Sequence, residues 1–224
     1  ILDINHCHIQ KDNANKILNI VKDYTKNLDP YDIIEHTGFL RNLMIRHAEN
    51  TNEIMVNIVT NFEDTTILQP LTDELVKKIP DIKSIVNNIT TRKSGVSIGE
   101  DETTIYGNNF IKEKINGLTF NISANSFFQT NTKQTEKLYS MIINESNLIG
   151  DEIVYDLYSG TGTIGISMAK HVKSVYGFEI SDSSINDALI NAKINNINNI
   201  KFFKGDLQNI FRVNSGARKI KKPD

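Results

Sequence analysis

Three acidic residues in the second half of the chain follow apolar runs at regular intervals and could bind the polar parts of a cofactor. Asp156, Glu179 and Asp206 lie 23 and 27 residues apart, each about one strand, one helix and their turns. In an open α/β sheet, ligands bind beyond the carboxyl ends of the strands, where all three carboxylates are expected. A carboxylate at the end of the second strand can accept hydrogen bonds from both hydroxyls of a ribose. The spacing therefore indicates a ribose-containing cofactor.

A glycine-rich turn, Asp156-Leu-Tyr-Ser-Gly-Thr-Gly-Thr163, directly follows the first of these strands. Gly160 and Gly162 let the backbone bend and approach a ligand where a Cβ atom would intrude. Residues 160–165 also match Gly-x-Gly-x-x-Gly, which places a dinucleotide pyrophosphate at a helix N-terminus. Asp156 would repel a pyrophosphate but can hold the ammonium of a methionine moiety, directly or through water. The turn thus favours S-adenosylmethionine (SAM) over NAD, while a purely structural role of the glycines is a further alternative.

The region after residue 130 alternates strictly between helical and strand-like patterns. The expected elements are helix 132–143, strand 152–157, helix 163–171, strand 174–179, helix 183–195 and strand 200–204. Parallel strands require such helical crossovers, so we expect an α/β fold with an open, doubly wound parallel sheet. Asn131 and Gln134 are placed to cap the first helix. Its apolar residues Leu138, Met141 and Ile142 are expected to face a core.

The first half of the chain predicts a separate α+β module. The expected elements are helix 12–27, a hairpin of strands 40–46 and 53–59, helix 70–79 starting at Pro70, and short strands 82–89, 103–106 and 118–122. Gly and Asn turns join the short strands. We therefore divide the chain into a central α+β domain at residues 1–122 and a cofactor-binding domain at residues 123–224.

Composition narrows the class of protein. The 224 residues are 39% hydrophobic and 23% charged, which fits one large or two small globular domains. The net charge of −2 means that a nucleic acid would be met by local basic patches. The single cysteine, Cys7, excludes an internal disulfide and a cysteine-based metal site built by this chain alone, so we expect no metal and a reducing, cytoplasmic compartment.

No apolar run reaches the about 18 residues of a membrane helix, so no membrane is expected. Since the chain begins at Ile1 without an initiating methionine, we expect a piece of a longer protein.

Motifs on both sides of the glycine turn give a resemblance to a known family. The stretch Ile122-Ser-Ala-Asn-Ser-Phe-Phe-Gln-Thr-Asn131, then Gln134 and Leu138-Tyr139, and then Asp156-Leu-Tyr-Ser-Gly-Thr-Gly162 are similar to the RNA uracil-5-methyltransferases. Upstream, residues 38–46, 85–89 and 105–107 resemble the central domain of that family. The likeness covers nearly the whole chain. It is greatest to the branch that methylates 23S ribosomal RNA, with transfer RNA as the alternative substrate.

The resemblance implies a Rossmann-like, SAM-dependent methyltransferase fold at residues 123–224, incomplete because it is truncated before its fourth strand, and a set of cofactor contacts. Gln129 of the Phe-Gln-x-Asn motif and Tyr158 of the turn would contact SAM. Glu179 would bind the ribose and Asp206 the adenine. Gln129 could instead only cap the following helix, Tyr158 could be a core aromatic residue, and Asp206 could be a solvated loop acid.

The resemblance also points to residues that would contact RNA. Phe127 and Phe128 would lie beside the cofactor and could stack on a flipped uracil, although core packing explains either residue equally well. Arg41 lies in a family-like motif and is the foremost candidate for a phosphate contact. Further basic candidates are Arg46, His47, Arg92, Lys93, Arg218, Lys219, Lys221 and Lys222.

The mechanism of the family requires groups that we do not expect in this chain. A cysteine thiolate adds to carbon 6 of uracil, carbon 5 of the resulting enolate attacks the SAM methyl group, and a general base removes the carbon-5 proton. In the family both groups lie beyond the position of Asp224. Cys7 precedes a helix in the first half, where a buried thiol without a catalytic role is expected. Residues 1–224 alone are therefore expected not to methylate RNA.

Other classes remain open beside this resemblance. A small-molecule or protein methyltransferase would share the turn and Glu179 but would not need residues 127–131. An NAD-dependent oxidoreductase would have to fit a dinucleotide at residues 160–165. A non-catalytic RNA-binding module is the remaining alternative.

Overall fold

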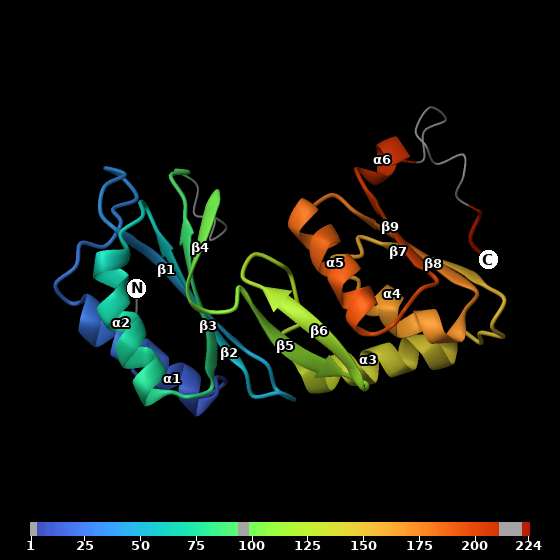
Figure 1. The fold of residues 1–224 in the computed structure, drawn as a ribbon, viewed down its shortest axis with the longest axis horizontal. Helices are drawn as coiled ribbons and strands as arrows, with labels where there is room; N and C mark the ends of the chain where they lie inside the picture. The colour runs from blue at the N-terminus through green and yellow to red at the C-terminus, as the bar shows by residue number, and fades with distance from the viewer. Residues whose placement is uncertain (1–3, 94–98, 211–220) are drawn as a thin grey trace. The chain divides into compact units, whose positions relative to one another are not determined.

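The computed structural model describes residues 4–93, 99–210 and 221–224, and the chain forms two compact units (Figure 1). The first unit comprises Ile1–Ala48 and Asn52–Ile111, and the second comprises Glu49–Thr51 and Lys112–Asp224. The tip of the first hairpin is thus part of the second unit. The functional division after residue 122 stays a prediction, because compactness alone does not say which residues act together.

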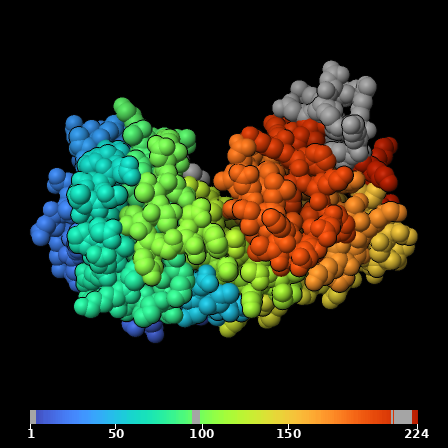
Figure 2. Space-filling view, in the orientation of Figure 1, coloured from blue at the N-terminus to red at the C-terminus, as the bar shows by residue number. Residues whose placement is uncertain are grey.

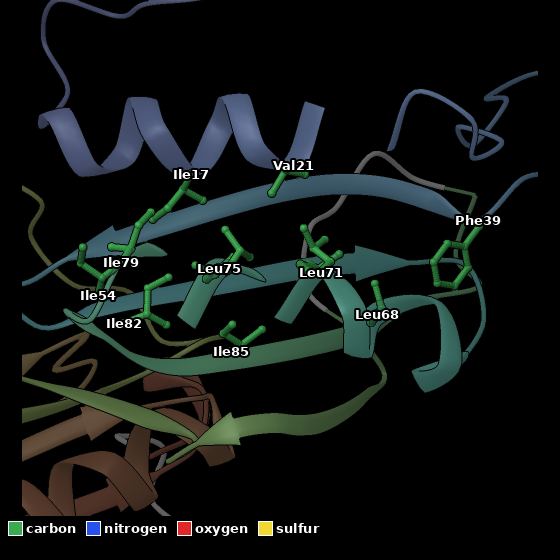
Figure 3. Close-up of a cluster of buried hydrophobic side chains, with 12 residues drawn as sticks. Ile17, Val21, Phe39, Ile54, Leu68, Leu71, Leu75, Ile79, Ile82 and Ile85 are labelled. Carbon is green, nitrogen blue, oxygen red and sulfur yellow. The ribbon is translucent and has the colours of Figure 1, made fainter. Parts of the chain in front are cut away.

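The first unit is a four-stranded mixed sheet with two helices on one face. Strands β1 (Leu40–His47) and β2 (Ile54–Thr60) form the expected antiparallel hairpin, β3 (Ile82–Ile89) is parallel to β2, and β4 (Asp101–Gly107) is antiparallel to β3. Helices α1 (Asp12–Thr25) and α2 (Thr65–Lys78) share one apolar cluster with β2 and β3 (Figure 3). The members of this cluster include Ile17, Leu71, Leu75, Val56 and Ile85. Burial of this cluster fixes both helices on the same face of the sheet.

Helix α2 begins at Thr65, five residues before the start expected at Pro70. The Asp64 side chain caps the helix by accepting hydrogen bonds from the backbone amides of Thr66 (3.0 Å) and Ile67 (3.3 Å). Because proline lacks an N–H, Pro70 removes one backbone hydrogen bond early in the helix. The cap, and not the proline, therefore sets the start of α2.

The second unit contains a hairpin, a parallel sheet and the helices that cross over between its strands. The hairpin consists of β5 (Phe110–Ile115), which the sequence analysis did not predict, and β6 (Leu118–Ser123). Helix α3 (Thr132–Glu145) leads to the parallel sheet β7-β8-β9, with β7 (Ile153–Leu157), β8 (Ser174–Glu179) and β9 (Ile200–Lys204). The crossovers are α4 (Thr163–Met168) with a 3₁₀ turn (Ala169–His171), and α5 (Asp182–Ile194); the short α6 (Leu207–Ile210) follows β9. This order confirms the alternation expected from the sequence.

The α5 helix lies at the surface of the second unit (orange in Figure 2). Leu189 and Ile190 are exposed on it, whereas Ala188 is buried. Helix α5 packs closely on Gly162, the residue before α4, because a Cβ atom on Gly162 would lie only 3.2 Å from the Ala188 Cβ. Small residues therefore let α5 approach the turn that follows β7.

The buried face of α3 differs from the expected one. Leu138 is 46% exposed and Met141 is 61% exposed, while Thr132 and Tyr139 are buried. The Tyr139 hydroxyl is hydrogen-bonded to the Thr163 hydroxyl at the start of α4 (2.8 Å). The expectation that Leu138 and Met141 face a core was wrong, and Ile142 is half-buried; the helix packs instead through Thr132, Thr135 and Tyr139.

Residues 4–93, 99–210 and 221–224 lack two kinds of feature. None of the helices there combines the length and apolar character needed to cross a lipid bilayer. No three His, Cys, Asp or Glu side chains of these residues are grouped so that they could hold a metal ion.

Candidate cofactor-binding site

The glycine turn after β7 has three residues with positive φ angles. They are Tyr158 (+60°), Gly160 (+52°) and Gly162 (+79°). A Cβ atom on Gly162 would lie 2.8 Å from Cζ of Phe202, so this glycine is needed for packing against β9. At Gly160, by contrast, no atom lies within 4 Å of the place that a Cβ would take. The turn thus packs on one side and is open beside Gly160, as a ligand-binding turn requires.

Glu179, the last residue of β8, is joined directly to this turn. Its Oε2 accepts a hydrogen bond from the Gly160 amide (3.0 Å), and its Oε1 accepts from the amides of Ile180 (2.8 Å) and Ser181 (2.9 Å). These bonds fix the carboxylate where the adjacent ends of β7 and β8 meet. A carboxylate offers about four lone-pair positions, so acceptor capacity remains for a ribose hydroxyl.

Asp156 is buried beneath the turn, at 8% exposure. Its Oδ2 accepts a hydrogen bond from the Gly165 amide in α4 (2.8 Å). Burial, opposed by the Gly165 hydrogen bond and assisted by the negative charge of Glu179, raises the pKa of Asp156 to about 6. At pH 7 the carboxylate is thus mostly ionised but poorly solvated. A cation such as an ammonium group would stabilise it.

The Phe-Gln segment before α3 contains one buried and one exposed aromatic ring. Phe127 is 73% exposed, whereas Phe128 is 8% exposed and packs against Phe120 with 6.3 Å between ring centroids. Gln129 is also exposed. Of the two phenylalanines singled out by the sequence, Phe128 is a core residue and Phe127 alone presents a ring that a base could reach.

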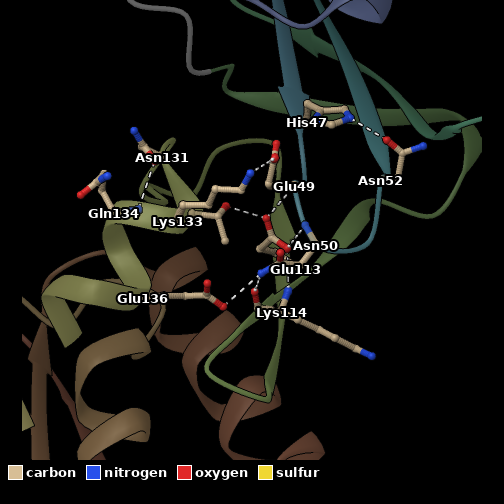
Figure 4. Close-up of polar contacts among 11 residues, drawn as sticks. His47, Glu49, Asn50, Asn52, Glu113, Lys114, Asn131, Lys133, Gln134 and Glu136 are labelled. Carbon is tan, nitrogen blue, oxygen red and sulfur yellow. Dashed lines mark hydrogen bonds and ion pairs between the residues drawn. The ribbon is translucent and has the colours of Figure 1, made fainter. Parts of the chain in front are cut away.

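Asn131 is the N-cap of α3, as expected: its Oδ1 accepts from the Gln134 amide (3.1 Å; Figure 4). The helix cap is therefore made by Asn131, which leaves the neighbouring Gln129 side chain available for another role.

Side-chain contacts link the Phe-Gln segment to the helices that begin after β7 and β8. Asp187 on α5 accepts hydrogen bonds from the hydroxyls of Ser123 (2.7 Å) and Ser126. The pair formed by Tyr139 and Thr163 links α3 to α4 (2.8 Å). Hydrogen bonds thus connect the segment that carries Gln129, and the helix α3 that follows it, to α5 and α4. Nothing in the sequence pattern singled out Asp187, because an acid within a helix is usually solvated.

Asp206 follows β9 and is exposed. Its Oδ1 accepts from the Gln208 amide (2.8 Å), so it caps α6. The amide of the preceding Gly205 donates to the Glu179 carbonyl (2.9 Å), which places the end of β9 beside the end of β8. The three acids chosen from the sequence therefore lie at the carboxyl ends of three adjacent parallel strands.

Arg41 lies on β1 in the first unit, and its guanidinium group is held within the fold. Nη1 donates to the Thr90 carbonyl (3.1 Å), Nη2 donates to the Arg92 carbonyl (2.8 Å), and the group stacks 3.8 Å from the centroid of the Tyr31 ring. These contacts give Arg41 a structural role in the first unit.

The other residues that the sequence analysis considered for RNA contact or catalysis either make contacts within the fold or lie outside the described residues. Arg92 forms an ion pair with Glu100 (2.6 Å). Cys7 is half-buried rather than buried, and its backbone is paired with the Asn15 side chain through two hydrogen bonds. Arg218 and Lys219 lie outside the residues that the structure describes.

One protein family matches most of the chain. The model for tRNA (Uracil-5-)-methyltransferases matches residues 44–222. The chain belongs to this family. The resemblance found in the sequence motifs is thereby confirmed at the level of the family.

Two curated bacterial relatives are similar along nearly the whole chain. An uncharacterised RNA methyltransferase of Chlorobaculum tepidum is 41% identical over 226 residues, covering 100% of this chain and 47% of the relative. Another, from Clostridium acetobutylicum, is 41% identical over 207 residues, covering 92% of this chain and 45% of the relative. The chain spans about half the length of the curated relatives it matches.

A solved structure of the same family shows the same fold. The tRNA (uracil-54, C5)-methyltransferase of Pyrococcus abyssi, in complex with S-adenosyl-L-homocysteine, is 30% identical with a TM-score of 0.75. The match covers 92% of this chain and 50% of that chain. The predicted fold, the α/β fold of SAM-dependent methyltransferases, is confirmed.

Proposed function

We propose that the protein to which this chain belongs transfers a methyl group from SAM to carbon 5 of a uridine in RNA. The proposal depends above all on the hydrogen bond from the Gly160 amide to the Glu179 carboxylate. This bond holds a carboxylate that can accept from a ribose hydroxyl beside a glycine turn with open space for a ligand. The S-adenosyl-L-homocysteine bound to the Pyrococcus abyssi relative supports the choice of cofactor. When bound, SAM would supply the methyl group.

In this proposal, different residues of the second unit bind different parts of SAM. Glu179 would accept a hydrogen bond from a ribose hydroxyl. Asp156 would stabilise the ammonium group, directly or through water, since its buried carboxylate gains most from a nearby cation. Asp206 would contact the adenine, and Gly160 would let the cofactor approach the backbone. Gly162 keeps the turn packed on β9.

Two exposed side chains complete the proposed cofactor site. Gln129 lies at the end of the Phe-Gln segment and Tyr158 in the turn, and both are open to solvent. Exposed groups on rigidly held segments can contact a ligand without reorganising the fold. We assign the cofactor contacts of the family to these two residues.

The methyl acceptor in this proposal is a uridine of 23S ribosomal RNA in the cytoplasm, with transfer RNA as the alternative. Phe127 would stack on the flipped uracil, because its exposed ring offers a face to a base. Carbon 5 of uracil is a poor nucleophile, so a cysteine thiolate would first add to carbon 6. Cys7 is the single cysteine of residues 1–224 and is tied to Asn15 in the first unit, so another part of the whole protein would supply the thiolate.

Calorimetry with S-adenosyl-L-homocysteine and with NAD tests the cofactor in the complete protein. We expect binding of S-adenosyl-L-homocysteine and no measurable binding of NAD; tighter binding of NAD would overturn the proposal. Transfer of a labelled methyl group to 23S ribosomal RNA and to transfer RNA transcripts tests the acceptor. Label on carbon 5 of uridine in 23S ribosomal RNA supports the choice made here, and label in transfer RNA alone would replace it with the alternative.

A further inference from the structure

Glu113 on β5 is a buried carboxylate that accepts four hydrogen bonds (Figure 4). It is 1% exposed. Its Oε2 accepts from the Glu49 amide (2.6 Å) and the Thr132 hydroxyl (2.7 Å). Its Oε1 accepts from the amides of Asn50 (3.0 Å) and Lys114 (2.7 Å). Two separate segments, the hairpin tip 49–51 and the first turn of α3, thus meet at one carboxylate inside the second unit.

Four donors use the full acceptor capacity of a carboxylate, which has about four lone-pair positions. A buried charge is tolerated only when its hydrogen bonds are made, so the positions of all four donors are constrained together. Further bonds reinforce the arrangement. The Asn50 side chain donates to the Lys114 carbonyl (2.7 Å) and to Glu136 on α3 (3.1 Å), and Lys133 on α3 forms an ion pair with Glu49 (3.3 Å).

The donor from α3 lies close in sequence to a residue of the proposed cofactor site. Thr132 is the first residue of α3, and Gln129 precedes it by three residues. At the other end of the same segment, Ser126 is fixed by Asp187 on α5. The short stretch that carries Gln129 is therefore held at both ends by a carboxylate, while Gln129 itself is exposed.

We propose that Glu113 is a positioning residue of the cofactor site: through Thr132 it fixes the first turn of α3 and with it the place of Gln129. Glu113 does not touch the cofactor in this proposal. The inference rests on the proposed function, because it concerns how the SAM site is held in shape.

Glu113→Gln is an informative substitution because it keeps the shape of the side chain. Each carboxylate oxygen accepts two of the four hydrogen bonds. An NH2 group in the place of Oε1 would lose the bonds from the Asn50 and Lys114 amides; in the place of Oε2 it would lose the bond from the Glu49 amide, and the Thr132 hydroxyl would have to accept instead of donate. The substitution therefore releases at least one backbone amide around Glu113, whereas Thr132→Val removes the bond to α3 itself.

A matched pair of threonine substitutions separates α3 from the hairpin tip. Thr132→Val removes only the hydroxyl that ties α3 to Glu113. Thr51→Val, in the hairpin tip, removes a hydroxyl that donates to the Lys112 carbonyl on β5 and not to α3. Both keep a β-branched side chain, and the first keeps the proposal testable even when Glu113→Gln does not fold.

The experiment measures S-adenosyl-L-homocysteine affinity, and the KM values for SAM and RNA, in the complete protein and its three variants. We expect Thr132→Val to weaken S-adenosyl-L-homocysteine binding by about tenfold or more, which corresponds to about 1.4 kcal/mol, and Glu113→Gln to weaken it less, because Thr132 can keep a hydrogen bond there. The KM for SAM should rise similarly, while the KM for RNA stays within about twofold. Thr51→Val should match the wild type in both.

Three results would overturn the inference. Unchanged S-adenosyl-L-homocysteine affinity in folded Thr132→Val would show that the tie to Glu113 does not position the site. An equal rise of both KM values, also in Thr51→Val, would show a general loss of stability. If the wild type itself does not bind S-adenosyl-L-homocysteine, the proposed function fails as well, and this outcome is distinct from the first two.

Discussion

The Gly160 amide donates a hydrogen bond to the Glu179 carboxylate, with 3.0 Å between the nitrogen and Oε2. The two residues are 19 positions apart, and the bond forms because β7 and β8 are adjacent parallel strands that end at the same edge. The bond makes the glycine turn and the proposed ribose acceptor one structural element. A substitution at either residue is therefore expected to change how the other meets a ligand.

Glu179→Gln tests whether this carboxylate binds the ribose. The substitution removes the charge that would bind the hydroxyl, and its NH2 group also removes the acceptor of either the Gly160 amide or the Ile180 and Ser181 amides. We expect the affinity for S-adenosyl-L-homocysteine to fall by about tenfold or more, as for one hydrogen bond to a charged group. Calorimetry with the 2′-deoxy analogue provides the control: the substitution should weaken binding of the analogue less than binding of S-adenosyl-L-homocysteine. An equal loss for both ligands would contradict a direct contact with the 2′-hydroxyl.

Gly160→Ala tests whether the open side of the turn receives a ligand. A new Cβ atom would meet no protein atom within 4 Å, so the expected loss of stability is only the about 1–2 kcal/mol of a left-handed backbone conformation. Gly117→Ala in the turn between β5 and β6 is the matched control, because its φ is also positive (+78°) and its surroundings are equally open. Melting temperatures of the two variants should fall similarly. Only Gly160→Ala should weaken S-adenosyl-L-homocysteine binding; equal affinities would show that the space beside Gly160 is not used.

The elements after residue 130 could be predicted because each strand and helix has a pattern of its own. The buried face of α3 could not, because hydrophobic periodicity places Leu138 inside while the hydroxyls of Thr132 and Tyr139 determine the packing. Their partners, Glu113 and Thr163, lie 19 and 24 residues away in sequence. The hydrophobic pattern of a single helix does not indicate contacts with residues so far away in the sequence.

Within the candidate site, the local motif locates the turn and Glu179 but does not distinguish neighbouring residues. Phe127 and Phe128 look alike in the sequence, yet one is exposed and the other is packed on Phe120. Arg41 likewise looks like a free cation, whereas its guanidinium group is bound to two carbonyls and a tyrosine ring. The sequence thus indicates the kind of site, and tertiary packing decides which side chains remain available.

Tyr139→Phe tests the contact between α3 and α4. It removes the hydroxyl that is hydrogen-bonded to Thr163 in a buried position. We expect the free energy of unfolding to fall by about 1 kcal/mol, measured by urea denaturation. A double-mutant cycle with Thr163→Val isolates the pair. A coupling energy near zero would mean that this hydrogen bond does not join the two helices energetically.

Phe127→Ala and Phe128→Ala test the division of roles between the two rings. Because Phe127 is exposed, its replacement should change the free energy of unfolding by less than about 0.5 kcal/mol. Replacement of the buried Phe128 should lower it by about 3–5 kcal/mol. If Phe127 stacks on the target uracil, Phe127→Ala should reduce methyl transfer by the complete protein without changing its melting temperature. Unchanged transfer would remove Phe127 from the RNA site.

Asp156 is expected to make stability and cofactor binding depend on pH in opposite directions. Its pKa is raised from the ordinary 3.8 to about 6 by burial, so the folded state binds the proton more tightly than the unfolded state. The free energy of unfolding should therefore fall as pH rises from about 4 to about 6, and then stay level. Binding of the cofactor ammonium group requires the ionised form, so S-adenosyl-L-homocysteine affinity should rise over the same pH range.

Asp156→Asn separates these two effects, because the amide oxygen can still accept from Gly165 while no charge is buried. The variant should be more stable than the wild type at pH 8 and equally stable near pH 4. The difference at pH 8 is at most about 3 kcal/mol, because the rise of the Asp156 pKa from 3.8 to about 6 costs about 1.4 kcal/mol for each pKa unit. Its affinity for S-adenosyl-L-homocysteine should be lower at pH 8 and independent of pH between 5 and 7. Urea denaturation and calorimetry at these pH values provide both measurements. A variant that is less stable at pH 8 yet binds normally would show that the carboxylate serves the fold and not the cofactor.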